Sequence, residues 1–371
     1  MSLSQWFCRT TKFQKKAFTT AALAAFVLPP LLDLHEDISL YYVMGGYGLK
    51  FKVADFGENI RGSHGDIPKF RKANIKLVFS SIAPLFPTLD TYRTEQLSRG
   101  YGHTTSLRIR SATTIALEHI KTYLNLFRSH RDQLKNVLRR EDLSKLLDDT
   151  KIGFLIAMEG AEALEDVEDV ELFYRLGLRS LQLTWNFDNK YSATCMSKKD
   201  YGLTGDGEKL VEVCNEFGVV VDLAHASKKA VLEACSLSKL PLIVSHANVM
   251  SVHSHARNLD DEELEAVKRS RGVVGMTFIT PTISKKPTYK KLADHVMYVY
   301  KNFGVDILAI GTDFFGLLNS GEPKGLEDVT KIRNLWAELS DRGLEQSELE
   351  KIAYLNALRV VEESAHRWKS N

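Results

Sequence analysis

Eight short apolar runs, rich in β-branched residues, recur along the chain and are separated by segments with helical periodicity. The runs are continuous rather than alternating, as expected of strands that are buried on both faces. Strands that alternate with helices form parallel sheets, and eight repeats favour a closed barrel over an open sheet. The predicted fold is therefore an α/β (β/α)8 TIM barrel, with strands at residues 31–37, 75–82, 152–159, 178–185, 219–225, 242–246, 273–278 and 307–313.

The segments between the runs carry helix start and stop signals. Thr204 is suited to begin a helix and Gly218 to end it, and residues 260–263 have the form of a capping box. Residues from about 104 to 150 are charged and helically periodic, which predicts an insertion of two or three helices before the third strand. Because no low-complexity linker divides the chain, residues 31–371 are expected to form one catalytic domain.

Residues 1–30 are expected to form an N-terminal extension. Three lysines precede an apolar stretch at residues 17–30, which imitates a signal peptide. No clean small-x-small cleavage site follows it, it is short for a bilayer, and it runs directly into the first predicted strand. A helical cover under the barrel is the preferred interpretation, and a secretion signal stays open.

The charge balance excludes some classes of partner. The chain has 49 basic and 47 acidic residues, a formal net charge of +2, which gives no electrostatic reason to expect nucleic acid or an anionic membrane surface. Its four cysteines are far apart and form no C-x-x-C pair, which fits a reducing compartment. We therefore expect a cytoplasmic protein without a membrane span, while residues 17–30 keep a secreted or membrane-associated form open.

Six polar side chains end five of the predicted strands. In a TIM barrel the active site lies at the carboxyl ends of the strands, and strand periodicity places His35 and Asp37 on the same face. So much buried charge is costly unless cations neutralise it. Imidazole and carboxylate without thiolate predict zinc, or less specifically manganese or iron, held among His35, Asp37, Glu159, His225, His246 and Asp313.

Each of these residues also has a purely structural interpretation. A single histidine at a strand end is more often a core or surface residue than a ligand, and Asp313 could simply cap a helix. The coincidence of six such residues at five strand ends favours the metal site. The remaining histidines lie in predicted loops or helices and are interpreted as surface residues or supports behind the ligands: His64, His103, His253, His255 and His295.

These residues and several other stretches resemble the membrane (renal) dipeptidases of the amidohydrolase superfamily. Most members of that superfamily begin with His-x-His on the first strand, whereas the dipeptidases have His-x-Asp, as in residues 35–37. The likeness runs from about residue 31 to 363, and the order and spacing of its motifs are specific. They include Met158-Glu-Gly160, Leu183-Thr-Trp-Asn186, Asp222-Leu-Ala-His225, Val244-Ser-His246, Arg257-Asn258 and Gly311-Thr-Asp313-Phe.

The resemblance implies two metal ions per chain, usually zinc. His35 and Asp37 would hold one ion, and His225 and His246 the other. Glu159 and a water or hydroxide would bridge them. A bound zinc ion lowers the pKa of water from 15.7 to about 7, so hydroxide is available at neutral pH.

The resemblance also implies the substrate and its contacts. The substrate would be a dipeptide with a free C-terminal carboxylate, which Arg257 would bind through its planar guanidinium. Asp313 would act as general base toward the bridging hydroxide or water and then pass a proton to the leaving amine. Trp185 and Asn186 would contact the substrate. A homodimer is expected from the family likeness alone.

The sequence departs from the best-known form of the family at three places. Trp185 stands where that form has a histidine; an indole N–H donates a hydrogen bond but cannot titrate, and a packed wall of the pocket is an equally good interpretation. Glu162 stands where histidine is frequent, just after Ala161 in place of a glycine. Phe315 stands where a second aspartate commonly follows. None of these changes removes a metal ligand, so they bear on substrate choice.

Two other functions stay open. The same metal site could act on an N-acyl amino acid, a lactam or another amide. Arg257 separates these substrates from dipeptides only partly, because it requires an anionic group near the scissile bond. A barrel that binds a ligand without catalysis is supported only by the substitutions at Trp185 and Glu162. The complete ligand set and Asp313 argue against it.

Overall fold

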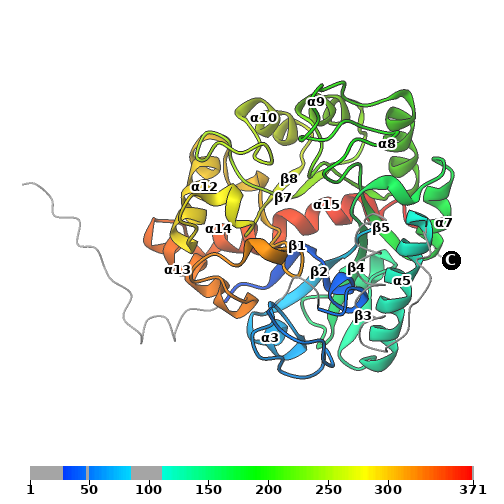
Figure 1. Cartoon of the computed structure of the whole chain (residues 1–371). Coiled ribbons are helices and arrows are strands. Elements are labelled where there is room, and N and C mark those ends of the chain that lie inside the picture. The colour runs from blue at the N-terminus through cyan, green and yellow to red at the C-terminus, as the bar shows by residue number, and fades with distance from the viewer. Residues whose placement is uncertain (1–27, 47–49, 85–110, 370–371) are drawn as a thin grey trace, which may run out of the picture.

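The computed structural model describes residues 28–46, 50–84 and 111–369 and forms a barrel of parallel strands surrounded by helices (Figure 1). The strands run in the order β2-β1-β9-β8-β7-β6-β5-β4-β3, and a further pairing of β2 with β4 closes eight of them into a ring. The predicted (β/α)8 barrel is confirmed. Its strands are β1 (Leu31–Glu36), β2 (Ile75–Ile82), β4 (Ile152–Met158), β5 (Leu178–Gln182), β6 (Val220–Asp222), β7 (Ile243–Ala247), β8 (Val273–Met276) and β9 (Leu308–Ile310).

Each predicted run overlaps one barrel strand, and most runs extend past the carboxyl end of that strand. His225 and Asp313 lie beyond β6 and β9 with φ angles of 65° and 61°. A residue in this left-handed region turns the backbone out of the sheet, and Asp and His tolerate it better than β-branched residues do. Strand pairing therefore ends while the apolar composition continues, and the turns lead into the site.

Helices follow the strands, and the predicted start and stop signals are confirmed in two of them, α8 and α10. The Thr204 side chain accepts a hydrogen bond from Gly207 N at the start of α8, and Gly218 ends that helix with φ 68°. Asp260 and Glu263 form the predicted capping box. The α-helices are α2 (Ile38–Val43), α3 (Ile67–Lys72), α5 (Ala112–Ser129), α6 (Arg140–Leu143), α7 (Asp169–Arg175), α8 (Gly205–Phe217), α9 (Lys228–Leu237), α10 (Asp261–Arg269), α11 (Thr280–Ile283), α12 (Tyr289–Phe303), α13 (Ile332–Asp341), α14 (Gln346–Glu350) and α15 (Asn356–Ala365).

The region predicted as a helical insertion differs from the prediction. Its described part holds α5 and the short α6, and between them lies a strand, β3 (Leu134–Asn136), that was not expected. β3 pairs in parallel with the first residues of β4, whereas β5 pairs with the last ones. Three residues without an apolar run carry no strand signal. Their partner is the start of β4, on the edge where β5 does not reach it. Residues 104–110 lie outside the described ranges.

The amino-terminal end of the barrel is covered by α15, which crosses behind the strands in Figure 1. This helix contacts β1, β6, β8 and β9, which lie on different sides of the ring. Strand residues such as Leu32, Val220 and Ile243 share one apolar cluster with Ala357 and Val360 of α15. The described ranges also hold four 3-10 turns and one π-helix: η1 (Ala161–Ala163), η2 (Val305–Ile307), η3 (Leu318–Ser320), η4 (Val329–Lys331) and η5 (Lys351–Leu355).

The predicted extension at residues 1–30 falls almost entirely outside the described ranges, which begin at residue 28. Within those ranges, no helix combines the length and the apolar character needed to cross a bilayer.

Candidate metal centre

Three buried imidazoles surround one carboxylate at the carboxyl end of the barrel. Glu159 Oε1, directly after β4, lies 3.5 Å from His225 Nε2 and 3.6 Å from His246 Nε2. The same oxygen lies 3.7 Å from Nε2 of His35, which comes from β1. The Nε2 atoms of His225 and His246 are 3.1 Å apart. All three ring nitrogens therefore point into one small volume.

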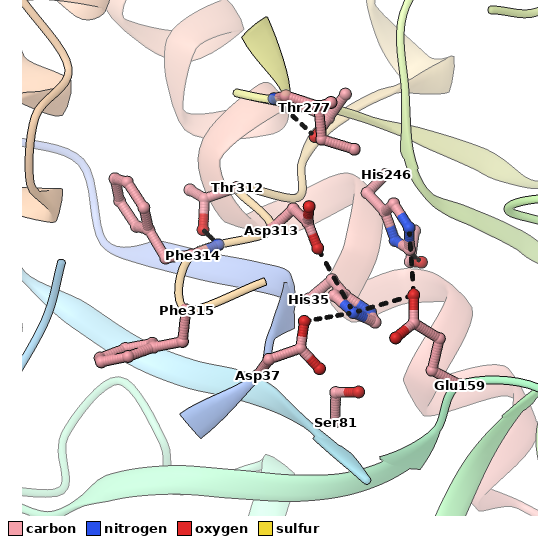
Figure 2. Close-up of polar contacts among 12 residues, drawn as sticks. His35, Asp37, Ser81, Glu159, His246, Thr277, Thr312, Asp313, Phe314 and Phe315 are labelled. Carbon is pink, nitrogen blue, oxygen red and sulfur yellow. Dashed lines mark hydrogen bonds and ion pairs between the residues drawn. The ribbon is translucent and has the colours of Figure 1, made fainter. Parts of the chain in front are cut away.

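Two further carboxylates complete the cluster. His35 Nε2 lies 3.5 Å from Asp37 Oδ2 and 3.7 Å from Asp313 Oδ1, as Figure 2 shows. All six side chains are buried. Their ligand atoms form three overlapping groups, each with all atoms within 4.8 Å of one another: His35, Asp37 and Glu159; Glu159, His225 and His246; and His35, His246 and Asp313. The six residues singled out in the sequence are thus brought together.

The electrostatics of this cluster favour bound cations. Among the described residues, His35 Nε2 and Asp37 Oδ1 are buried polar atoms without a hydrogen-bond partner. Although burial opposes it, the charges of Asp37 and Glu159 raise the pKa of His35 to about 10. Burial lowers the pKa of His225 and His246 well below the usual value, which leaves neutral imidazoles, the form that binds metal. The donor set therefore fits divalent ions such as zinc.

Asp313 is held at the edge of the cluster by its backbone. Its N–H donates to the carbonyl oxygen of His35 at 3.0 Å, which ties the turn after β9 to β1. Burial, followed by the negative charge of Asp37, raises the pKa of Asp313 to about 7. The same two causes raise the pKa of Glu159 well above its usual range. The carboxyl groups of Asp313, Glu159 and Asp37 lie close together and share few neighbouring positive charges.

The two imidazoles after β6 and in β7 are oriented by different partners. His225 Nδ1 lies 2.9 Å from Asn186 Oδ1, and His246 Nδ1 lies 2.8 Å from Ser245 Oγ. Since both Nε2 atoms face Glu159, we assign the proton of each ring to Nδ1, which donates to these oxygens. The Ser245 hydroxyl and N–H both bond to the buried Asp222 carboxylate. His246 is therefore backed by a carboxylate through a hydroxyl, and His225 by a neutral amide.

A cavity of about 350 Å³ opens above the cluster. The predicted substrate residues Arg257, Trp185 and Asn186 all line it, beside Asp37, Glu159, His225 and Asp313. Arg257 is buried, and its Nη2 donates to the carbonyl oxygen of His246 at 3.0 Å. The Trp185 ring is half-buried, with its centroid 6.2 Å from that of His225. Asn186 has a second role that the sequence did not suggest, because it orients His225.

The other two departures from the family pattern lie away from the ligands. Phe315 is fully buried and points away from the ligand side chains in Figure 2, into a cluster with Tyr41, Phe51 and Phe56. Glu162 lies outside the cavity lining and accepts a hydrogen bond from Asn189 Nδ2 at 3.3 Å. Burial raises the pKa of the Glu162 carboxyl.

Two histidines interpreted as surface or supporting residues are buried. His295 accepts from Val249 N at 3.1 Å and its Nε2 lies 3.0 Å from the carbonyl oxygen of Ile283, so it belongs to the core and touches no ligand. His64 accepts from Phe315 N at 2.8 Å and therefore supports the turn that carries Asp313. Backbone atoms satisfy both nitrogens of His295, whereas the second nitrogen of His64 lies 3.2 Å from Glu322 Oε1. These partners are distant in the chain, and the sequence gives no sign of them. His253 and His255 are partly exposed, and His103 lies outside the described residues.

Comparison with known proteins gives a consistent result. The family model described as membrane dipeptidase (peptidase family M19) matches residues 22–370. Dipeptidase verJ of Clonostachys rogersoniana is 32% identical over 337 residues, which cover 90% of this chain and 84% of that protein. A dipeptidase of Schizosaccharomyces pombe is 30% identical over 363 residues, 93% of this chain and 84% of that protein.

A solved structure has the same fold. It is a metallo peptidase from Rhodobacter sphaeroides, liganded with a phosphinate mimic of the dipeptide L-Ala-D-Ala. It superposes with a TM-score of 0.76 at 25% identity and covers 91% of this chain and 100% of that chain. Since the family model spans nearly all of the chain and the barrel is shared, the chain belongs to the membrane dipeptidase family, peptidase family M19.

Proposed function

We propose that this chain is a binuclear zinc dipeptidase that hydrolyses the peptide bond of dipeptides with a free C-terminal carboxylate. One observation carries the proposal: three imidazole Nε2 atoms lie within 3.7 Å of one oxygen of Glu159. Two carboxylates, from Asp37 and Asp313, lie on the other side of His35. Such a set of imidazole nitrogens and carboxylate oxygens is stable in a buried site when cations bind there.

The residues divide into two ligand groups that share Glu159. His35 and Asp37 would hold one ion, and His225 and His246 the other, with Glu159 reaching both. When bound, the ions supply a water of lowered pKa and a positive charge that polarises the scissile carbonyl.

The remaining residues act on the substrate and its proton. Arg257 lines the same cavity as the ligands and is suited to bind the C-terminal carboxylate with two parallel N–H donors. The Asp313 carboxylate faces the cluster from the turn after β9 and would accept a proton from the attacking water. It would return that proton to the amine as the peptide bond breaks. The dipeptide mimic in the Rhodobacter sphaeroides relative supports a substrate of this size.

The test combines metal analysis with one substitution. The purified chain should contain two zinc ions and hydrolyse dipeptides from a panel of L,L and L,D compounds. Asp313→Asn should keep the zinc and lower kcat by about 10²–10⁴-fold, the usual contribution of general acid–base catalysis. Zinc-loaded protein that cleaves no member of the panel would contradict the proposal.

Charge reversal at Arg257 separates dipeptides from other amides. Arg257→Glu should raise KM for dipeptides with a free carboxylate and have little effect on dipeptide amides, which lack that charge. Unchanged turnover of free dipeptides would instead favour the alternative substrates, which are N-acyl amino acids, lactams and other amides.

A further inference from the structure

The charged groups of the substrate cavity are confined to its base. In the described part of the chain, the charged residues that line the 350 Å³ cavity are Arg257 and the ionisable residues of the metal cluster. The rest of the lining is apolar or uncharged: Leu40, Trp185, Asn186, Met196, Ile279, Gly316, Leu317, Leu318, Asn319 and Ser320. The proposed function assigns these charged groups to metal ions, to the substrate carboxylate or, for Asp313, to proton transfer.

The apolar residues come from several parts of the rim rather than from one segment. Leu40 lies in α2, Ile279 follows β8, and Leu317 and Leu318 follow β9. Met196 is held over β6, because the preceding residue, Cys195, donates its N–H to the carbonyl oxygen of His225 at 2.7 Å. A substrate side chain that leaves the base in any of these directions therefore meets apolar atoms.

We call the apolar lining of the cavity its wall. On one side this wall continues outward as an apolar shelf formed by Trp185, Phe187 and Met196. Trp185 packs against Phe187, with ring centroids 6.0 Å apart. Phe187 is 57% exposed and Met196 is 47% exposed, two of the large apolar side chains that remain open to solvent. Exposed apolar groups beside a cavity are typical of binding surfaces. Asn186 lies between the two aromatic residues and holds His225, so the shelf is fixed to the ligand set.

A charged side chain in this cavity would lose water without gaining a partner. Asp37 and Glu159 are assigned to the metal ions, Asp313 to proton transfer and Arg257 to the substrate carboxylate, so among the described lining residues neither a cationic nor an anionic side chain finds a free counter-charge. An apolar side chain instead removes surface from water on both sides of the contact. Trp185 contributes to this discrimination, because its indole is uncharged and presents an apolar face to the cavity.

We propose that the enzyme selects dipeptides whose side chains are uncharged and mainly apolar, and that Trp185 and Met196 are specificity-determining residues. This inference rests on the proposed dipeptidase function and names the substrate class of that same site.

Matched substrate pairs test the selection. With zinc-loaded full-length enzyme, kcat/KM is measured for Met-Ala against Lys-Ala and for Gln-Ala against Glu-Ala, and for the same pairs with the two positions exchanged. Gln and Glu have the same side-chain length, Met and Lys differ by one atom, and each pair changes the charge. We expect the uncharged member to be favoured at least tenfold in at least one position. Charged and uncharged members within threefold of each other at both positions would overturn the proposal.

A swap of charge in the wall gives the sharper result. Met196→Glu should raise kcat/KM for Lys-containing dipeptides relative to their Met counterparts at least tenfold, and Met196→Lys should do the same for Glu relative to Gln. Leu172→Glu is the matched control, because Leu172 is 48% exposed on α7 and outside the cavity lining. Variants at Met196 that leave the selectivity unchanged would place this residue outside the specificity site.

Binding without turnover separates failure of this inference from failure of the proposed function. Dissociation constants of the same dipeptide pairs are measured by calorimetry on zinc-loaded Asp313→Asn. Selective binding of the uncharged members without hydrolysis by the wild type supports the wall and contradicts the dipeptidase activity. Hydrolysis with equal binding of both members contradicts the wall alone.

Discussion

Two kinds of buried imidazole occur in this molecule, and they differ in what their ring nitrogens face. His295 lies in the core with both nitrogens bonded to backbone groups, at 3.1 Å and 3.0 Å. In His225 and His246, Nδ1 pairs with a side-chain oxygen, of Asn186 and Ser245 respectively, while both Nε2 atoms face Glu159 and each other. Both kinds are fully or nearly fully buried and carry lowered pKa values. Burial alone therefore does not identify a functional histidine; ring nitrogens that converge on a buried carboxylate do.

Removal of metal should have the largest effect, because it acts on His225 and His246 and not on His295. A chelator should abolish dipeptide hydrolysis, and zinc should restore it. The chelator should also lower the melting temperature, because an ion at a thousand times its Kd stabilises the native state by about 4 kcal/mol. Calorimetry and activity are measured on the same samples. Full activity after chelation, verified by metal analysis, would show that the converging nitrogens are not a metal site.

Acid should destabilise the folded protein through His295, the histidine in the core. Burial lowers the pKa of His295 from 6.5 to about 4, so the native state keeps the ring neutral while the unfolded chain takes up a proton. The stability that depends on neutral His295 is complete above pH 6.5 and is lost as the pH falls toward 4. This loss amounts to about 1.4 kcal/mol per pH unit, about 3 kcal/mol at pH 4.

The substitution His295→Gln isolates this effect, because glutamine cannot titrate. Urea unfolding between pH 4 and 7 is compared for the wild type and the variant, both with chelator, so that protonation of the metal ligands contributes equally. The wild type should lose more stability than the variant as the pH falls. Parallel pH curves would assign the acid sensitivity to other groups.

Loss of the hydroxyl that orients His246 should have a smaller effect than loss of the metal. Ser245→Ala removes the hydroxyl between His246 and Asp222 and should weaken zinc binding about 10–100-fold, as expected for a group that orients a ligand. Ser180→Ala is the control, because the buried Ser180 hydroxyl donates to Val220 O and does not touch a ligand. Competition with a chromogenic chelator measures the affinity. Equal affinities in the two variants would contradict the orienting role.

The metal cluster was predictable because it depends on strand order alone. Once the runs form a parallel barrel, residues at their carboxyl ends meet, and His35, Asp37, Glu159 and Asp313 need no further information. The support behind His246 depends on sheet register. Asp222 pairs with Ile243, and this register brings its carboxylate to Ser245 N. Neither β3 nor the burial of His295 was predicted, since each depends on a partner far away in the chain.

The helix α15 has a consequence for how the chain matures during synthesis. It packs beneath β1, β6, β8 and β9, yet it follows every strand in the sequence. While the ribosome is still making residues 356–365, the apolar underside of the ring formed by Leu32, Val220 and Ile243 has no cover. Nascent chains stalled before this helix should therefore recruit chaperones that bind exposed apolar surface, and release of the last helix should end that association.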